Sequence, residues 1–382
     1  MPITAVDEAL LLRAVALAEH AIGLSDPNPR VGCVLHTADG RLAGEGFTQQ
    51  AGGPHAEVMA LRAASAAGLP LAGGTAWVSL EPCAHHGRTP PCADALVAAG
   101  LARVVVALVD PYAQVAGRGM QRLRAAGIQV DLAPAGAARD AAQALNVGFL
   151  SRVQRGRPWL RLKLAASLDG RTALPDGRSQ WITGSEARRD GHAWRRRAGA
   201  VLTGSGTLLA DDPQLDVRLV PTQRQPLRVV LDSSFQTPPT ARLLQAGGRV
   251  LVVGAQAQPA RMEALRQAGA ELLLLPGADG RVDLAALLRQ LASDGVSELH
   301  VEAGAVLNAA LLGADLVDEL LVYTAPKLLG PGRPMAELPA LPGLDQALDF
   351  RFTDCRLIGD DLRLLARRRG ADAFLQADPQ PG

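Results

Sequence analysis

The sequence predicts two consecutive α/β domains, each built on a largely parallel sheet. Short apolar segments alternate with helix-like segments along both halves of the 382-residue chain, which is the rhythm of parallel strands covered by helices. A polar segment with Gly and Pro, residues 151–158, interrupts this rhythm near the middle, and we expect it to be an exposed linker at the domain boundary. Near the end, two strand-like segments flank Gly359 and Asp360, which predicts an antiparallel hairpin. A parallel sheet that closes on a hairpin differs from the simplest Rossmann pattern.

The first half begins with a helix over residues 7–22, preceded by the capping-box pair Thr4 and Asp7. Further helices are expected at residues 55–68, 92–100, 118–126 and 137–150. The expected strands cover residues 31–36, 41–46, 75–80, 103–109 and 128–132. These elements complete one unit, so we predict a first domain over residues 1–150.

The second half repeats the alternation after the polar segment. Its expected strands cover residues 159–167, 200–205, 227–232, 249–254, 271–275, 298–303 and 319–325, before the hairpin. After Gly370 no packing pattern remains. We therefore predict a second domain over residues 155–370 and a disordered tail over residues 371–382.

Composition narrows the classes of function. Hydrophobic residues make up 48% and charged residues 20% of the chain, and the net charge is +1. Sequence-independent phosphate binding needs a basic surface, and the one dense run, residues 195–197, is more typical of a solvated helix face. Four cysteines without a secretion signal do not predict disulfides, and no apolar stretch is long enough to cross a membrane. We expect a cytoplasmic protein without nucleic-acid or membrane partners.

The sharpest motif combines one histidine with two cysteines. His55 and Cys92 stand at expected helix starts, and Cys83 follows a strand. Catalytic zinc takes three protein ligands and leaves its fourth position to water, so these residues predict a catalytic zinc site. Glu57, two residues after His55, can reach that water without binding the metal and act as general acid and base. This arrangement is typical of zinc-dependent nucleobase deaminases.

Other interpretations of these residues make different demands. A purely structural zinc would use four ligands, and His85 or His86 would have to supply the fourth. A substrate contact suits these two histidines better, because they lie in the loop between the cysteines. Cys33 and Cys355 have no partner at a metal-binding spacing, so we expect both to be buried core thiols.

Eight residues separate Cys83 from Cys92, where nucleobase deaminases usually have two. The chain resembles the bifunctional riboflavin-biosynthesis deaminase–reductase family in the segments PNPRVGCV, GPHAEVMAL, EPCAHHGRTPPC and DPYAQVAGRGMQRLRAAGI. The resemblance extends over about residues 7–368. It implies a cytidine-deaminase-like three-layer domain that binds zinc and deaminates 2,5-diamino-6-(5-phosphoribosylamino)pyrimidin-4-one at C2.

The resemblance also implies three substrate contacts in the first domain. Asn28 would hold the pyrimidine, Arg88 the 5′-phosphate, and Asp110 would approach the ribosyl group. The sequence departs from the family pattern at Tyr112, where the usual DPNP motif has Asn. It also departs at Asp26, where His often precedes PNP.

In the second half, the residues by themselves predict only an α/β sheet that could bind a nucleotide. Gly204-Ser205-Gly206 resembles the start of GxGxxG, but Leu209 occupies the third glycine position. Gly304 joins a strand to a helix over residues 305–312, whose backbone N–H groups suit a diphosphate. A glycine at such a junction is equally typical of a plain turn.

The family resemblance continues through LRLKLAASLDGRTA, SQWITGSEARRD, VLTGSGTLLADDPQLDVR, VVLDSS, VEAG and APKLLG. It implies a dihydrofolate-reductase-like domain that uses NADPH to reduce C1′ of the ring-opened ribosylamine. The implied NADPH residues are Ala165, Trp181, Thr207, Asp211, Ser233 and Gly304, the last within the segment 304–310. The implied phosphosugar contacts are Ser179, Arg195, Leu215, Arg218 and Glu302, with Lys163 as a further candidate. Non-functional interpretations make Trp181 a core residue, Arg195 part of a solvated face and Asp211 a turn cap.

Three other functions predict different patterns. A nucleic-acid or nucleoside deaminase with a non-catalytic C-terminal domain predicts the two-residue cysteine spacing and a basic groove. A binding or regulatory protein on a degenerate fold predicts loss of the zinc ligands or of Glu57, and an inactive reductase predicts broken motifs. The sequence shows none of these patterns. We expect phosphoribosyl pyrimidine substrates and a homo-oligomer, either a dimer or a tetramer.

Overall fold

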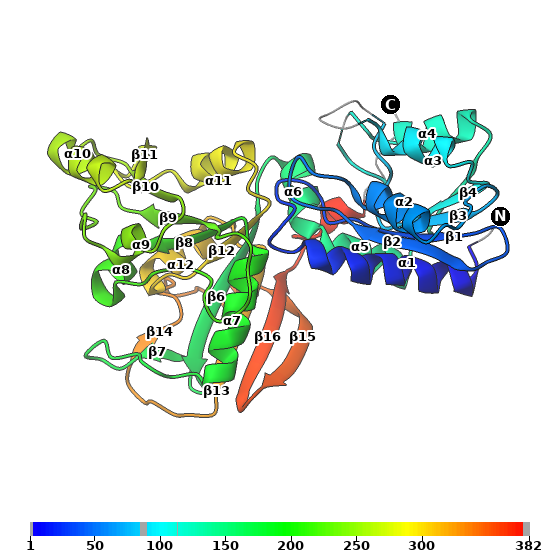
Figure 1. Ribbon diagram of the computed structural model, residues 1–382. Helices are drawn as coiled ribbons and strands as arrows, with labels where there is room; N and C mark the ends of the chain where they lie inside the picture. Colours follow the sequence, from blue (N-terminus) through cyan, green and yellow to red (C-terminus); the bar gives the residue numbers. More distant parts are fainter. Residues whose placement is uncertain (1–2, 85–89, 113, 377–382) are drawn as a thin grey trace. The chain divides into compact units, whose positions relative to one another are not determined.

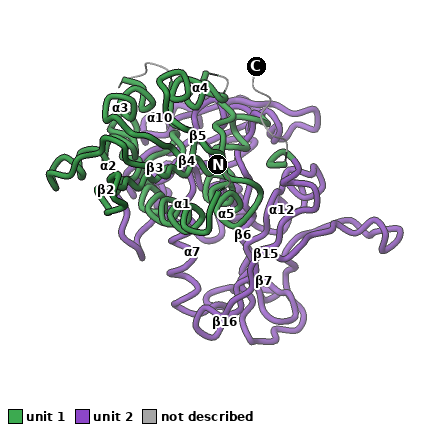
Figure 2. The backbone as a smooth tube through the Cα atoms, turned by 90° about the vertical axis from the view of Figure 1, so that its right-hand side faces the viewer, with its two compact units in different colours: residues 1–155, 374–382 green, residues 156–373 purple. Residues whose placement is uncertain are grey.

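The computed structural model describes residues 3–84, 90–112 and 114–376. The chain divides into two compact units, coloured separately in Figure 2. Unit 1 comprises Met1–Arg155 and Phe374–Gly382, and unit 2 comprises Gly156–Ala373. A search of the described helices finds none with the length and apolar character needed to cross a membrane.

Unit 1 is built on a mixed sheet, whose strands in the described residues follow the order β2-β1-β3-β4-β5. The strands are β1 (Gly32–His36), β2 (Leu42–Phe47), β3 (Thr75–Val78), β4 (Arg103–Val106) and β5 (Gln129–Leu132). The pairs β3–β4 and β4–β5 are parallel, but β1 runs antiparallel to both β2 and β3. The prediction of a mainly parallel sheet is therefore wrong here, because the tight connection between β1 and β2 can only join antiparallel neighbours.

Helices cover both faces of this sheet, which gives unit 1 three layers. One face carries α1 (Ala5–Ala18), which a short turn η1 (Glu19–Ala21) extends, and α5 (Ala137–Leu145). The other carries α2 (Ala56–Ala66), α3 (Cys92–Ala98) and α4 (Arg118–Ala125), as Figure 1 shows. Helix α1 begins at the predicted capping box: Asp7 N–H donates to Thr4 Oγ1 at 3.2 Å, and Thr4 N–H donates to Asp7 Oδ2 at 2.9 Å.

Two glycines of β2 allow α2 to pack directly on the sheet. A Cβ atom on Gly44 would lie 2.3 Å from the carbonyl oxygen of Ala60, and one on Gly46 would lie 2.4 Å from that of Ala56. Any side chain at these positions would push the helix away. The close contact fixes the first turn of α2, which carries His55 at its N-cap and Glu57.

The segment expected to be a polar linker begins as a helix. Residues up to Arg155 belong to α6 (Val147–Arg155), in which Ser151 is buried and accepts a hydrogen bond from Arg155 Nη2 at 2.6 Å. The helix is followed by Gly156, whose φ of 66° suits a glycine after a helix end. The linker prediction is thus wrong for residues 151–155, because polarity alone does not distinguish a solvated helix face from a linker.

The chain returns to unit 1 after Ala373. Phe374 and Leu375, in the short turn η3 (Ala373–Leu375), pack against the unit 1 core. The Arg155 guanidinium lies 4.4 Å from the centre of the Phe374 ring, and Gln143 Nε2 donates to the Leu375 carbonyl at 2.9 Å. The predicted disorder is therefore wrong for residues 371–376, since the partly buried side chains of Phe374 and Leu375 anchor them. Residues 377–382 lie outside the described part.

Unit 2 contains a larger sheet, in which the described strands follow the order β11-β10-β9-β8-β12-β6-β13-β16-β15. They are β6 (Trp159–Ser167), β8 (Ala200–Gly204), β9 (Leu227–Leu231), β10 (Val250–Gly254), β11 (Glu271–Leu274), β12 (Glu298–Val301), β13 (Glu319–Ala325), β15 (Phe350–Ile358) and β16 (Asp361–Arg368). Pairing is parallel from β11 to β13 and antiparallel from β13 through β16 to β15. The closing hairpin around Gly359 and Asp360 is confirmed.

Helices also cover both faces of the parallel part of the unit 2 sheet. One hydrophobic cluster packs α11 (Leu284–Ser293) and α12 (Ala305–Gly313) on one face. Another packs α8 (Ser205–Asp211), α9 (Arg242–Gln245) and α10 (Pro259–Gln267). Helix α7 (Ser185–Arg197) contacts β13, and η2 (Leu344–Gln346) precedes β15. Two short strands, β7 (Arg171–Ala173) and β14 (Arg333–Pro334), pair separately and were not predicted, because so few residues carry no periodicity.

Candidate functional site

A candidate metal centre lies where two helices of unit 1 begin. His55 is the N-cap of α2, Cys92 is the first residue of α3, and Cys83 follows β3. His55 Nδ1 lies 3.6 Å from Cys83 Sγ and 3.3 Å from Cys92 Sγ, and the three ligand atoms lie within 4.8 Å of one another. Zinc–nitrogen and zinc–sulfur bonds that meet at a tetrahedral angle would separate the two ligand atoms by about 3.5 Å. The donor set therefore fits zinc. His85 and His86 lie outside the described residues, so the open fourth position stays a prediction.

The two thiols are electrostatically unequal without a cation between them. The hydrogen bond from Cys92, joined by one from His55, lowers the pKa of Cys83 to about 4 although burial opposes this. The same bond, with burial and the charge of Glu57, raises the pKa of Cys92 above its ordinary value. A bound divalent cation favours the thiolate form of both ligands.

Glu57 is buried beside the ligands, with 3% of its surface exposed. Burial, reinforced by the negative charge of Cys83, raises the pKa of Glu57 to about 7. A carboxyl group with such a pKa can both accept and return a proton near neutral pH. Its place in the first turn of α2 brings it beside the candidate metal centre without making it one of the three clustered ligands.

Glu81 organises the loop between β4 and α4, a role that the sequence analysis missed. Its carboxylate accepts four backbone N–H hydrogen bonds, from Asp110 and Met120 at 3.2 Å and from Gly117 and Gly119 at 2.9 Å. Asp110 is buried, which raises its pKa to about 7, and its Oδ1 accepts from the Tyr112 N–H at 2.8 Å. The sequence signal that could have identified Glu81 is its position directly before Pro82 and Cys83, where a carboxylate follows a buried strand.

The other predicted residues of unit 1 are less constrained by the structure. Asn28 lies in the loop before β1, where its N–H donates to the Ser25 carbonyl at 2.9 Å. Arg88 lies outside the described residues, so its role and that of Asn28 stay predictions. Cys33 is buried as expected, whereas Cys355 of unit 2 is exposed. The second expectation is wrong because most side chains of the edge strand β15 face solvent.

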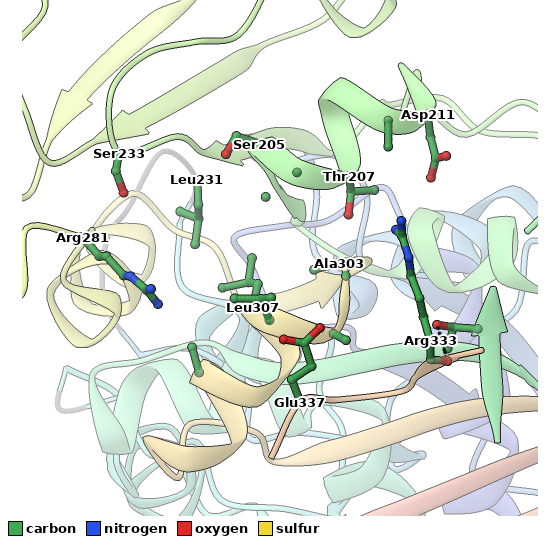
Figure 3. Close-up of a pocket in the computed structure, with 18 of the residues that line it drawn as sticks. Ser205, Thr207, Asp211, Leu231, Ser233, Arg281, Ala303, Leu307, Arg333 and Glu337 are labelled. Atoms are coloured by element: carbon green, nitrogen blue, oxygen red, sulfur yellow. Dashed lines mark hydrogen bonds between the residues drawn. The ribbon is translucent and has the colours of Figure 1, made fainter. Parts of the chain in front are cut away.

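Unit 2 contains two adjoining cavities, of about 720 and 680 Å³, which share Thr172, Ser179, Thr207, Asp211, Ala303 and Ala305. The first, shown in Figure 3, is also lined by Ser233, Gly304 and Ala310. The second is also lined by Lys163, Ala165, Trp181, Arg195, Leu215, Arg218 and Glu302. The structure thus gathers every reductase residue implied by the resemblance around these two cavities.

The first cavity fits a dinucleotide at the start of α12. Gly304 is the N-cap of this helix and provides no side-chain capping hydrogen bond. Ala305, Val306 and Leu307 of the first turn line the cavity wall. Backbone N–H groups at such a helix start suit a diphosphate. Gly304 thus lies at a helix start that lines a cavity, and its contact with a diphosphate stays a prediction.

A charged cluster forms one wall of the second cavity. Arg195 Nε and Nη2 donate to the two carboxylate oxygens of Glu302 at 2.5 and 2.9 Å, and Lys163 Nζ lies 3.9 Å from Glu302 Oε2. Burial alone would raise the pKa of Glu302, but the two cations hold it well below its ordinary value. The Arg195 side chain is 12% exposed, so it does not belong to a solvated face.

The non-functional interpretations of Trp181 and Asp211 also fail. Trp181 is 61% exposed beside the second cavity and is no core residue. Asp211 lines both cavities at the last position of α8, and it is Asp212, with a φ of 39°, that caps the helix.

Two further residues of the second cavity were missed. Tyr323 donates from its hydroxyl to Asp190 Oδ2 at 2.5 Å, and the His192 Nδ1 accepts from the Arg218 N–H at 3.2 Å. Burial and the neighbouring cations lower the pKa of His192 to about 4, which keeps the ring neutral and able to accept this bond. Neither residue could be identified from the sequence. Its pattern predicts a buried strand position for Tyr323 and an ordinary position on a helix face for His192.

Comparison with known proteins matches each unit separately. Residues 4–108 match the cytidine and deoxycytidylate deaminase zinc-binding region. Residues 158–364 match the RibD C-terminal domain. The first match covers His55, Glu57 and Cys83 together with Cys92, and the second covers all the cavity residues that were predicted for the reductase.

Full-length relatives resemble the whole chain. The riboflavin biosynthesis protein RibD of Escherichia coli (strain K12) is 47% identical over 372 residues, which cover 94% of this chain and 98% of the relative. The protein of that name from Haemophilus influenzae is 41% identical over 377 residues, covering 95% and 98%.

Two solved structures cover 95% of this chain and 98% of their own. They are Acinetobacter baumannii RibD, form 1, with 42% identity and a TM-score of 0.85, and a Thermotoga maritima diaminohydroxyphosphoribosylaminopyrimidine deaminase/5-amino-6-(5-phosphoribosylamino)uracil reductase, with 32% identity and a TM-score of 0.84. Since these relatives align with both units in the same order, this chain belongs to the RibD family of bifunctional riboflavin-biosynthesis deaminase–reductases.

Proposed function

We propose that this chain catalyses two consecutive steps of riboflavin biosynthesis, one in each unit. Unit 1 would hydrolyse 2,5-diamino-6-(5-phosphoribosylamino)pyrimidin-4-one to 5-amino-6-(5-phosphoribosylamino)uracil and ammonia. Unit 2 would then reduce the ribosyl group of that product to ribityl with NADPH. The observation that carries the proposal is the gathering of His55, Cys83 and Cys92 beside the buried Glu57.

In the deamination, zinc held by His55, Cys83 and Cys92 supplies the Lewis acid that makes water reactive at neutral pH. Glu57 takes a proton from the attacking water and passes protons to the ring nitrogen and to the departing ammonia. The pKa of Glu57, raised to about 7 by burial, suits both halves of this task. Its burial also excludes bulk water from the carboxylate.

Three residues of unit 1 would hold the pyrimidine substrate. Asp110 approaches the ribosyl group from the loop that Glu81 fixes through its backbone N–H groups. Asn28 holds the pyrimidine and Arg88 the 5′-phosphate, and both assignments rest on the family resemblance. Tyr112, 41% exposed in the same loop as Asp110, replaces the Asn of the usual family motif and supplies a larger contact surface.

In the reduction, NADPH supplies the hydride, and the first cavity would hold the cofactor. The start of α12 at Gly304, which has no side-chain capping hydrogen bond, would hold the diphosphate, and Ser233 would contact the adenosine. Thr207 and Asp211 belong to both cavities and would flank the nicotinamide, together with Ala165 and Trp181 of the second cavity.

The second cavity would bind the phosphosugar. The Glu302 carboxylate, held by Arg195 and Lys163, presents oriented charges to the open ribosyl chain. Arg218, whose backbone is fixed by His192, offers its guanidinium to the phosphate. Ser179 and Leu215 complete the wall. In this scheme positioning contributes most of the catalysis by the protein.

The two activities would separate between the two units. All residues assigned to deamination belong to unit 1, and all those assigned to reduction belong to unit 2. We place the boundary at Gly156 because α6 belongs to unit 1 and continues to Arg155.

We further propose a cytoplasmic homo-oligomer that does not bind nucleic acid. Free thiols are typical of reducing compartments, and the four cysteines are free. The net charge of +1 gives no basic excess for nucleic acid. The edge strand β15 exposes Phe352 and Leu357, at 64% and 72%, which is the kind of sheet edge that a second copy could cover. Light scattering after size exclusion measures the oligomeric state, and a monomer at micromolar concentration contradicts this part.

The central test follows the products by mass. Purified protein incubated with the diaminopyrimidine substrate should release ammonia and form the uracil intermediate, and added NADPH should convert that intermediate to the ribitylamino product. Elemental analysis of protein purified without chelator should find near-stoichiometric zinc. Absence of deamination from zinc-loaded protein would overturn the proposal, and deamination without reduction would restrict it to unit 1.

A further inference from the structure

The first cavity contains a charged feature that the family resemblance does not assign. Two arginines line it, Arg281 and Arg333. Figure 3 shows them at opposite ends, with Arg281 on the side of Ser233 and Leu231 and Arg333 on the side of Thr207 and Asp211. The two ends must therefore meet different parts of a bound dinucleotide.

The topology of the sheet decides which end receives the adenosine. The hydride must reach the substrate, so the nicotinamide belongs where the two cavities meet, at Thr207 and Asp211. Leu231 ends β9, which lies three strand positions from β6, where Lys163 contacts the second cavity. At about 4.8 Å per strand this separation is about 14 Å. The end of the cavity near Leu231, Ser233 and Arg281 is thus remote from Lys163 of the second cavity. Figure 3 also shows it on the opposite side from Thr207 and Asp211, so this end suits the adenosine.

Arg281 projects into this remote end from a fixed turn. Gly277 N–H donates to the Arg281 carbonyl at 2.7 Å, and Pro276 and Val282 form an isolated β-bridge across the turn. The Arg281 N–H donates to Asp279 Oδ1 at 3.0 Å, so the nearby carboxylate is turned back onto the backbone of the turn. The guanidinium itself makes no ion pair or hydrogen bond with any residue in the described ranges. Arg281 is thus a positioned cation with its donors available to a ligand.

We infer that Arg281 binds the 2′-phosphate of the cofactor and makes unit 2 select NADPH over NADH. The 2′-phosphate on the adenosine ribose is the one group by which these cofactors differ, and an arginine close to that ribose accommodates it. A guanidinium can make paired, charge-assisted hydrogen bonds to a phosphate. NADH cannot accept these bonds at its adenosine ribose, because it has no 2′-phosphate. The inference rests on the proposed NADPH-dependent reduction and deepens it.

The test compares binding of the oxidised cofactors NADP⁺ and NAD⁺ by calorimetry, without turnover. Wild-type protein should bind NADP⁺ more tightly. In Arg281→Gln the affinity for NADP⁺ should fall about 10- to 100-fold, as expected for loss of charge-assisted hydrogen bonds, while NAD⁺ affinity changes less than about two-fold. Arg281→Lys keeps the charge but loses the paired hydrogen-bond geometry. Its affinity for NADP⁺ should lie between those of wild-type protein and Arg281→Gln. The fragments 2′,5′-ADP and 5′-AMP should reproduce the contrast, because they lack the nicotinamide.

Arg266→Gln is the matched control. Arg266 lies on α10, pairs with Glu263 at 3.6 Å, and lines neither cavity. The substitution Arg266→Gln removes one positive charge from the same unit. Both cofactors should bind this variant as tightly as they bind wild-type protein. Equal weakening of NADP⁺ and NAD⁺ in Arg281→Gln, or an unchanged preference, overturns the inference while leaving the reductase proposal intact. If wild-type protein bound neither cofactor, the reductase proposal itself would fail.

Discussion

The two units encode their chemistry in opposite ways. In unit 1 the candidate metal ligands and Glu57 come from three short segments. Two of them place His55, Glu57 and Cys92 at helix starts, and the third places Cys83 in the loop after β3. In unit 2 the residues that line the two cavities are spread along the chain from Lys163 to Glu337. Many of these residues are glycine, alanine, serine or leucine. A metal requires particular donor atoms, whereas a dinucleotide is held largely by backbone groups and shape. Single substitutions should therefore affect deamination sharply and reduction gradually.

The largest effect is expected from Glu57→Gln, which keeps the shape of the side chain and removes its proton transfer. Deamination should fall about 100- to 10,000-fold, the range typical for loss of a general acid–base group. Zinc content should persist, because Glu57 is not one of the clustered ligands. Reduction of separately supplied 5-amino-6-(5-phosphoribosylamino)uracil should continue. Deamination within a few-fold of wild type would show that the acid–base role is wrong.

A smaller loss is expected from Glu81→Gln, because the change replaces one acceptor oxygen by an N–H₂ group that faces backbone donors. The bonds to Gly117 and Gly119 weaken, so the loop that carries Asp110 loses its fixed position. We expect deamination kcat/KM to fall about 10- to 100-fold, with zinc retained. Steady-state kinetics measure kcat/KM, and metal analysis measures the zinc content. Glu45→Gln, which removes a carboxylate paired with Arg13 elsewhere in unit 1, serves as the control and should be near wild type.

The smallest effect is expected from Asp211→Ala, one contact among many in a distributed site. Reduction kcat/KM should fall by about 10-fold, the value of roughly one ordinary hydrogen bond. Ammonia release should be unaffected, so the deaminated intermediate should accumulate even with NADPH present. Glu263→Ala, on α10 and outside both cavities, is the control. A loss as steep as that of Glu57→Gln would break the contrast between the units, and a parallel loss of deamination would indicate coupled domains.

The ease of sequence prediction followed the same contrast. The candidate ligands His55, Cys83 and Cys92 were identifiable from residue type and local position, because His55 and Cys92 lie at helix starts and Cys83 lies in the loop after a buried strand. Every parallel strand of unit 2 was found, since buried strands carry a clear apolar run. The cofactor and sugar residues, in contrast, came from the family resemblance rather than from their chemistry.

Residues whose role depends on distant partners were missed. Glu81 bonds to backbone groups 29 to 39 positions later, a relation that no local pattern records. The proposed role of Arg281 can be inferred only from the fold, which brings the turn after β11 and the end of β9 to the same cavity. The sequence predicts a linker at the polar end of α6 and a disordered tail around Phe374, because burial on one side of a short segment leaves little trace in composition.

The contact between Arg155 and Phe374 has a consequence for the connectivity of the protein. The chain leaves unit 1 and re-enters it at adjacent points, so unit 2 is an insertion into unit 1 rather than a C-terminal appendage. One proteolytic nick before β6 would leave the fragments in contact, since Phe374 and Leu375 pack against the unit 1 core. Truncation after residue 150 would cut α6 and uncover that core. A short peptide joining Arg155 to Phe374 would instead excise the reductase and close a complete deaminase.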